Sequence, residues 1–199
     1  LLKIINKNKQ KFEIVLLTAN KNYKELLKQA KKNNVKNIII KNQKSYDRLN
    51  KINKNKNFKI FNNFNNFEKI FEKKIDYVMS SIVGIEGLEP TVNIIKYTKS
   101  IAIANKESII CGWNLIKKNL IKHRTSFIPV DSEHFSIWYA LKNVNISKIK
   151  KIYLTASGGP LLNAPKTKFN NIKINDVLKH PNWKMGKKIS VDSSNMINK

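Results

Sequence analysis

Short apolar runs alternate with helical patterns along the first 130 residues, and this alternation constrains the fold more than any other feature. In the helical patterns, apolar residues recur every three or four positions, as at Leu26, Leu27 and Ala30. Strands that alternate with helices of about ten residues are typical of βαβ units, so the pattern predicts a parallel sheet. The expected strands cover residues 12–18, 37–41, 58–61, 76–80, 100–104 and 126–130. The expected helices cover residues 23–32, 45–52, 64–71, 89–97 and 107–120.

The net charge of +26 is the feature that first suggests a nucleic-acid-binding protein. However, every basic residue except Arg48 and Arg124 is lysine, and the chain also has 29 asparagines. Arginine is the preferred residue for reading phosphates and guanine, whereas an excess of lysine and asparagine is typical of an AT-rich genome. We therefore interpret the charge as a solvated surface. A basic nucleic-acid-binding module, with strongly salt-dependent affinity, stays as the alternative.

Three further observations limit the class of protein. Cys111 is the single cysteine, which excludes a disulfide or a cysteine-based zinc site within this chain. No apolar run approaches the roughly 18 residues that a membrane-spanning helix needs. The chain begins at Leu1 and stops at Lys199 without a recognisable terminus, so we expect a piece of a longer protein.

The composition changes near residues 125–131, where we expect a second domain to begin. From there glycine, proline, histidine and tryptophan gather in short motifs, as at residues 157–160 and 180–183. Such loops carry functional sites more often than cores do.

Two carboxylates follow the apolar run at residues 126–130. In an extended segment, Asp131 and Glu133 project to the same face, at the carboxyl end of an expected parallel strand. Two convergent carboxylates suit Mg²⁺ or Mn²⁺. The alternative is a local role, because Asp131 or Ser132 could cap a helix over residues 133–141.

Two polar clusters follow other expected strands. Lys106 opens a helix, where a cation is unfavourable, and it could hold a phosphate or a carbonyl oxygen. The alternative is an ordinary surface residue in the first turn of the helix. Asn20, Lys21 and Asn22 follow the first expected strand. An acidic residue at this place in a dinucleotide-binding fold would favour NAD, and none is present. These three residues suit the 2′-phosphate of NADP instead.

The remaining motifs lie in the second domain. Ser157 belongs to a small-residue turn after an expected strand over residues 151–156. This turn could hold a phosphate or be a simple tight turn. His180 and Trp183 precede Gly186 in a segment that could act as a lid. The alternative is a structural histidine and a tryptophan that belongs to the core. Ser193, Asn198 and Lys199 are residue types that bind phosphate.

Taken together and in order, these motifs resemble one family, the 1-deoxy-D-xylulose 5-phosphate reductoisomerases of non-mevalonate isoprenoid biosynthesis. The matching strings are IANKES at 103–108, IPVDSEH at 128–134, LTASGGP at 154–160, HPNWKMGKKISVDSS at 180–194 and MINK at 196–199. The resemblance implies an α/β fold. It also implies that a Rossmann-like NADPH-binding domain, without its first strand, covers residues 1–124 and that the start of an α+β catalytic domain covers residues 125–199.

The resemblance also implies a reaction. 1-Deoxy-D-xylulose 5-phosphate is rearranged to an aldehyde, which NADPH reduces to 2-C-methyl-D-erythritol 4-phosphate with the help of a divalent metal, Mg²⁺ or Mn²⁺. It implies a homodimer with a small-molecule substrate and with neither nucleic acid nor membrane as partner. The location would be a plastid (an apicoplast) for an AT-rich protozoan source and the cytoplasm for a bacterial one.

Carried over residue by residue, the family pattern assigns roles to the motif residues. The catalytic residues are Lys106, Asp131, Glu133 and His180, of which Asp131 and Glu133 bind the metal. The substrate-binding residues are Lys106, Ser132, Glu133, Ser157, His180, Trp183, Ser193, Asn198 and Lys199. The residues that contact NADPH are Asn20, Lys21, Asn22, Asn105, Glu107, Met185 and Gly186.

Some parts of the family pattern lie outside this sequence. The glycine-rich nucleotide motif, the third metal carboxylate and the C-terminal helical domain are absent from residues 1–199. We therefore expect the full-length protein to be active and this chain alone to be inactive. A different metal-dependent NADP dehydrogenase and a catalytically dead relative also stay open, although every expected residue type within the chain is present.

Overall fold

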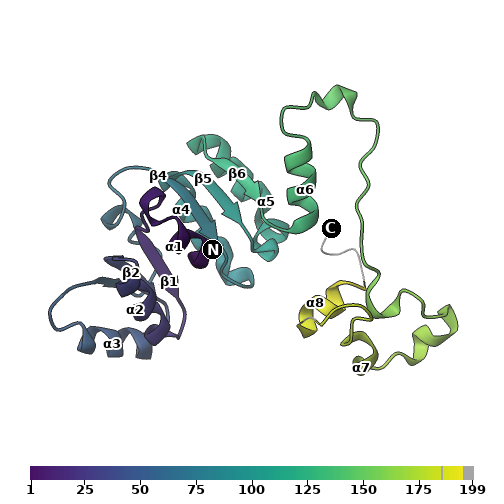
Figure 1. Cartoon of the computed structure of the whole chain (residues 1–199), viewed down its shortest axis with the longest axis horizontal. Coiled ribbons are helices and arrows are strands. Elements are labelled where there is room, and N and C mark those ends of the chain that lie inside the picture. The colour runs from purple at the N-terminus through teal and green to yellow at the C-terminus, as the bar shows by residue number, and fades with distance from the viewer. Residues whose placement is uncertain (185, 195–199) are drawn as a thin grey trace.

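The computed structural model describes residues 1–184 and 186–194 and contains two parallel sheets of three strands each. The first sheet has the order β1 (Leu16–Ala19), β2 (Asn37–Ile40) and β3 (Lys59–Phe61). The second has the order β4 (Ile75–Ser80), β5 (Thr98–Ile103) and β6 (Ser126–Pro129), as Figure 1 shows. The expected α/β class with parallel strands is thus confirmed, although the strands form two hydrogen-bonded sheets rather than one.

The first sheet is built around its central strand. Ile38, Ile39 and Ile40 of β2 are fully buried, which explains why this segment is a continuous apolar run rather than an alternating one. Helices α2 (Tyr23–Lys32) and α3 (Gln43–Ile52) connect its strands. Each begins after an asparagine whose side-chain oxygen accepts a backbone N–H of the first turn, Asn22 for α2 and Asn42 for α3.

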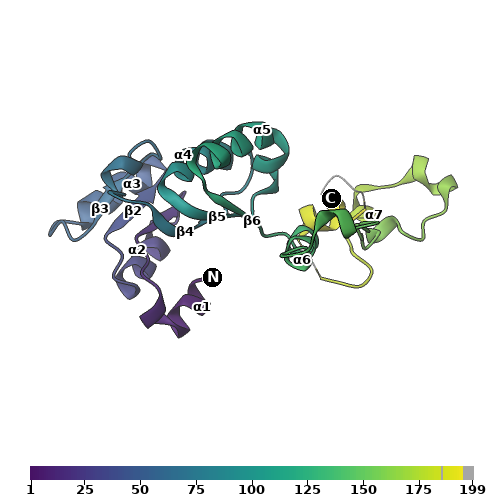
Figure 2. The ribbon, with the colours of Figure 1, turned by 90° about the horizontal axis from the view of Figure 1, so that it is seen from above.

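The second sheet is covered on one face by two helices. Helix α4 (Leu88–Ile94), followed by the 3₁₀ turn η4 (Ile95–Tyr97), lies beside the longer helix α5 (Lys106–His123) (Figure 2). Ile101 and Ile103 of the central strand β5 are buried beneath them. The same core cluster includes Ile39 of the first sheet, so the two sheets share apolar packing without sharing hydrogen bonds.

The helix expected over residues 64–71 is wrong. The structure has only the 3₁₀ turn η2 (Phe67–Lys69) there. Asn63 explains the difference, because its side-chain oxygen accepts the backbone N–H of Asn65 and the side-chain N–H of Asn66. Such local bonds compete with helical ones. The aromatic residues of the expected stripe still serve the core, since Phe67 and Phe71 are buried.

Residues 131–194 have a different character. The elements there are short: α6 (Ser132–Ala140), η5 (Ile146–Lys148), η6 (Gly159–Leu161), η7 (Lys166–Asn171), α7 (Ile174–Val177) and α8 (Lys187–Asp192). A long connection over residues 141–158 leads from α6 to the lobe that carries α7 and α8 (Figure 1). The strand expected over residues 151–156 is wrong, since no described strand pairs with this segment and Tyr153 is 76% exposed.

Three short elements complete the description: α1 (Leu2–Lys7), η1 (Lys9–Lys11) and η3 (Ile85–Gly87). Within residues 1–184 and 186–194, no helix combines the length and the apolarity that crossing a membrane requires.

Candidate functional site

The carboxyl ends of β5 and β6 bring two of the expected motifs to the same edge of the second sheet. The two strands pair in parallel with Ile103 opposite Pro129, so the segments that begin at Ala104 and at Val130 leave the sheet side by side. Lys106 lies on the first of these segments and Asp131 on the second. Open parallel sheets bind ligands at this edge.

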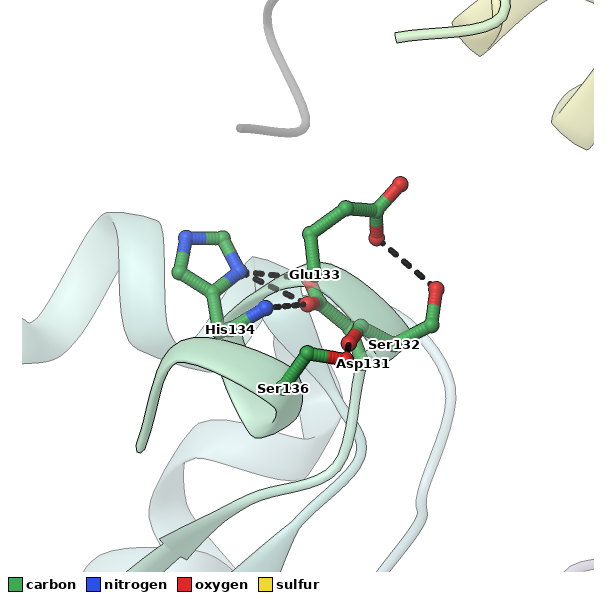
Figure 3. Close-up of polar contacts among 5 residues, drawn as sticks. All are labelled: Asp131, Ser132, Glu133, His134 and Ser136. Carbon is green, nitrogen blue, oxygen red and sulfur yellow. Dashed lines mark hydrogen bonds and ion pairs between the residues drawn. The ribbon is translucent and has the colours of Figure 1, made fainter. Parts of the chain in front are cut away.

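Asp131 is held by two neighbouring interactions (Figure 3). Its Oδ1 accepts the backbone N–H of His134 at 2.9 Å, which caps helix α6. Its carboxylate also contacts Nδ1 of the His134 ring, at 2.7 Å from Oδ1 and 2.8 Å from Oδ2. The capping role that the sequence left open is therefore present, and it orients the carboxylate expected to bind the metal.

The spacing argument assumed that Asp131 and Glu133 lie in one extended segment, and this assumption is wrong. Helix α6 begins at Ser132, so Glu133 lies in its first turn. Its Oε2 accepts the hydroxyl of Ser132 at 2.9 Å (Figure 3). Carboxylate and hydroxyl oxygens fit a hard divalent cation. Among the described residues, however, no group of three acidic, histidine or cysteine side chains gathers as a metal site would require.

Sequence reasoning assigned no role to His134, although it stands in the motif. The signal that could have found it is the spacing, because a residue three positions after an N-cap has its side chain beside the cap. A histidine that bonds a ligating carboxylate fixes the orientation of that ligand. The geometry thus adds His134 to the residues of interest at this edge.

The start of α5 presents Lys106 and Glu107 after a buried asparagine. Asn105 is 3% exposed, and its Oδ1 accepts the backbone N–H of Ser108 at 3.0 Å. Its Nδ2 donates to the backbone carbonyls of Gly84, at 2.7 Å, and of Ile82. The side chain of Asn105 is therefore engaged within the protein, while Lys106 and Glu107 are half-buried at the helix start.

The segment after β1 carries Asn20, Lys21 and Asn22 at the carboxyl end of the first sheet. Its backbone is tied to the next βα connection, since the carbonyl of Asn20 accepts Asn42 N–H at 3.0 Å and that of Lys21 accepts Ser45 Oγ at 2.9 Å. All three residues are exposed, although hydrogen bonds fix the backbone of the turn, and Asn22 Oδ1 caps α2. An exposed lysine on a fixed backbone suits a phosphate group.

Ser157 and His180 meet in the lobe that carries α7 and α8. His180 is 9% exposed, and its Nε2 lies 3.2 Å from Ser157 Oγ. Its Nδ1 lies 3.1 Å from Asn182 N and 3.2 Å from Trp183 N. Because a backbone N–H can only donate, Nδ1 accepts, and the neutral ring carries its hydrogen on Nε2 and donates it to Ser157. Trp183 stacks on the ring at a centroid distance of 4.6 Å.

Ser193 approaches the same turn from the end of α8. Gly158 and Gly159 both have positive φ angles, 74° and 57°, so two successive residues adopt the conformation that favours glycine. A Cβ on Gly159 would lie 2.6 Å from the hydroxyl oxygens of both Ser193 and Ser194, which shows how closely the chain segments pack. Ser193 Oγ donates to the Ser190 carbonyl at 2.6 Å.

The structure thus gathers the site residues into three groups on different elements: the turn after β1, the starts of α5 and α6, and the lobe around Ser157. Gly186 lies directly before α8, and its carbonyl accepts Ser190 N–H at 3.0 Å. Met185, Asn198 and Lys199 lie outside the described residues.

Family models identify the relatives of this chain. The model described as 1-deoxy-D-xylulose 5-phosphate reductoisomerase matches residues 1–112, and the model of the C-terminal domain of that enzyme matches residues 127–199. A curated relative of the same name from Pelagibacter ubique (strain HTCC1062) is 58% identical over all of this chain and 52% of its own length. The chain spans about half the length of the curated relatives it matches.

Solved structures agree with the sequence comparison. The 1-deoxy-D-xylulose 5-phosphate reductoisomerase from Zymomonas mobilis in complex with NADPH has a TM-score of 0.84 and 30% identity over 97% of this chain and 50% of its own. A DOX-P reductoisomerase in complex with NADPH, fosmidomycin and magnesium has a TM-score of 0.79 and 31% identity over 99% of this chain and 51% of its own.

Proposed function

The chain belongs to the 1-deoxy-D-xylulose 5-phosphate reductoisomerase family, and we propose that the full-length protein converts 1-deoxy-D-xylulose 5-phosphate to 2-C-methyl-D-erythritol 4-phosphate. The observation that carries the proposal is the match of almost the whole chain to solved structures of this enzyme, with Lys106, Asp131 and His180 present in the family motifs. NADPH and a divalent metal are the cofactors, because both solved relatives are complexes with NADPH and one of them also contains magnesium.

Asp131 and Glu133 would hold the metal ion, with Ser132 and Lys106 contacting the substrate beside it. The metal supplies a Lewis acid for the rearrangement, and NADPH supplies the hydride that reduces the aldehyde. Asp131 is preoriented for this role, because its carboxylate is already bonded to the backbone and the ring of His134. Lys106 brings a positive charge to the same edge of the sheet.

The substrate phosphate would bind at Ser157 and Ser193, together with Asn198 and Lys199. His180 donates to the oxygen of Ser157, so the hydroxyl hydrogen of Ser157 stays available for a phosphate oxygen. Trp183 is 56% exposed next to His180 and would cover the bound substrate, which excludes water from the reaction.

NADPH would bind along the carboxyl edge of both sheets. Lys21, flanked by Asn20 and Asn22, would contact the 2′-phosphate. The remaining contacts would come from Glu107, Met185, Gly186 and the backbone of Asn105, whose side-chain amide already bonds within the protein. Residues 1–124 would form the NADPH-binding domain and residues 125–199 the catalytic part.

We also propose a homodimer that has neither nucleic acid nor membrane as partner. The relative from Pelagibacter ubique is bacterial, which supports the cytoplasm as the location. The comparisons do not support the plastid location expected for a protozoan source.

The test is an assay of the full-length protein with 1-deoxy-D-xylulose 5-phosphate, NADPH and Mg²⁺ or Mn²⁺. We expect substrate-dependent NADPH oxidation that needs the metal, with 2-C-methyl-D-erythritol 4-phosphate identified by mass spectrometry. NADPH oxidation without the rearranged product would indicate a different dehydrogenase. Absence of turnover, together with salt-sensitive binding of duplex DNA that NADPH displaces, would favour a nucleic-acid-binding module.

A further inference from the structure

The loop between β4 and α4 lies at the carboxyl edge of the second sheet, yet it contributes little to the core. Val83 is 82% exposed and Ile85 is 55% exposed. Its only regular element is the short turn η3 (Ile85–Gly87). Apolar burial therefore does not explain how this loop keeps its place.

A single buried side chain ties the loop to the neighbouring helix. Both carbonyls that Asn105 Nδ2 contacts, those of Ile82 and Gly84, belong to this loop. The Oδ1 atom of the same amide bonds Ser108 N–H in the first turn of α5. Asn105 thus joins two segments that are more than 20 residues apart in sequence and uses both of its N–H groups to do so.

The far end of the loop is packed against the same amide. A methyl group at Gly87 would overlap the amide of Asn105 and would lie 2.6 Å from the carbonyl oxygen of Ile82. Thr91 Oγ1 donates to the Gly87 carbonyl at 2.6 Å, and Ser80 Oγ lies 2.6 Å from the same hydroxyl. Both ends of the loop are therefore held by buried polar contacts.

We infer that Asn105 is a positioning residue, which places the loop of residues 82–87 against the start of α5 and so shapes the edge where the cofactor binds. The inference rests on the proposed function, because it takes NADPH as the ligand of this edge. Asn105 then acts on the cofactor through the backbone of the loop that it holds. Its own amide hydrogens do not reach the cofactor, because both bond to carbonyls of the protein.

Asn105→Asp in the full-length protein separates the two functions of this side chain. The aspartate still caps α5, but it places an oxygen against the carbonyls of Ile82 and Gly84. We expect hydrogen exchange at Gly87, whose N–H bonds the Gly84 carbonyl, to become about tenfold faster. We also expect the dissociation constant of NADPH to rise about tenfold and the affinity for the sugar phosphate to change less than twofold.

Asn119→Asp is the matched control, since Asn119 lies on the same helix and donates to a backbone carbonyl on an exposed face. It should change neither measurement. Asn105→Ser is the second variant, because serine caps helices well and adds no charge, so it serves should the aspartate variant not fold.

Unchanged hydrogen exchange at Gly87 in a folded variant would overturn the inference that Asn105 holds the loop of residues 82–87 in place. Faster exchange with unchanged NADPH affinity would overturn its role in cofactor binding. An equal loss of NADPH and sugar phosphate affinity would also overturn it, because that result indicates a general structural defect. A wild-type protein that binds no NADPH would refute the proposed function. The hydrogen-exchange measurement would still test whether Asn105 holds the loop of residues 82–87 in place.

Discussion

Residues 16–129 are organised around buried apolar side chains, whereas residues 131–194 are organised around hydrogen bonds. All core residues of the described structure lie between Leu26 and Leu120. Among the described side chains of the second region, the buried ones are polar, namely His180 and Ser190, and apolar ones such as Ile146 and Ile174 are largely exposed. The first region is thus a scaffold that its own packing stabilises, and the second carries most of the expected chemistry on short elements.

The largest expected effect comes from Asp131→Asn, which tests whether the second region contributes chemistry rather than stability. Asparagine still caps α6 but loses the charge that a metal ion needs. We expect kcat/KM of the full-length protein to fall by about two to three orders of magnitude, with little change in Tm.

The control for this variant is Asp176→Asn, because Asp176 also bonds a backbone N–H at a helix start of the same region. It should leave kcat/KM within about twofold, as most surface substitutions do. Equal losses in both variants would contradict the metal role of Asp131.

The second prediction concerns the scaffold and compares Ile101→Ala with Ile146→Ala. Ile101 is fully buried in β5, whereas Ile146 is 79% exposed. We expect the first substitution to lower the free energy of unfolding by about 3 kcal/mol and the second by less than about 0.5 kcal/mol, measured by urea denaturation. A similar cost at both positions would show that contacts outside the described structure bury the second region as well.

The smallest effect is expected at His180. Two substitutions there separate its hydrogen bond to Ser157 from its bonds to the turn at residues 180–183. His180→Ala removes the donor to Ser157 and the acceptor for the N–H groups of Asn182 and Trp183. We expect the KM for the sugar phosphate to rise about tenfold, because Ser157 loses its orientation. His180→Gln keeps a donor near the position of Nε2 and should recover part of this loss. No recovery would assign the effect to the turn at residues 180–183.

Much of the scaffold could be predicted from the sequence, because its elements are recorded in local patterns. The apolar run at residues 37–41 became β2, and the helical spacing at residues 23–32 became α2 with the same bounds. Two expected elements did not form, because hydrogen-bond partners rather than apolar periodicity decide the backbone conformation there. Residues 151–156 have the composition of a strand but no described partner, and Asn63 bonds its own turn instead of allowing a helix at residues 64–71.

The site was predictable in its residue types and not in its contacts. The motif around Asp131 indicated a metal carboxylate or a helix cap, and the structure shows the cap together with the His134 ring that no expectation included. The motif around Asn105 suggested a direct cofactor contact, whereas the structure engages both N–H groups of its amide in the protein.

The sequence by itself determined the order of the six strands and of most helices between residues 16 and 129, the α/β class and the family, because periodicity and motif residues are local properties of the chain. Only the tertiary structure decided that the strands form two sheets with a shared core, and which polar atoms meet at their edge. The physical reason is that a hydrogen bond needs its donor and acceptor about 3 Å apart in the folded chain. For Asn105 and the carbonyl of Gly84, that proximity arises from the parallel pairing of β4 with β5.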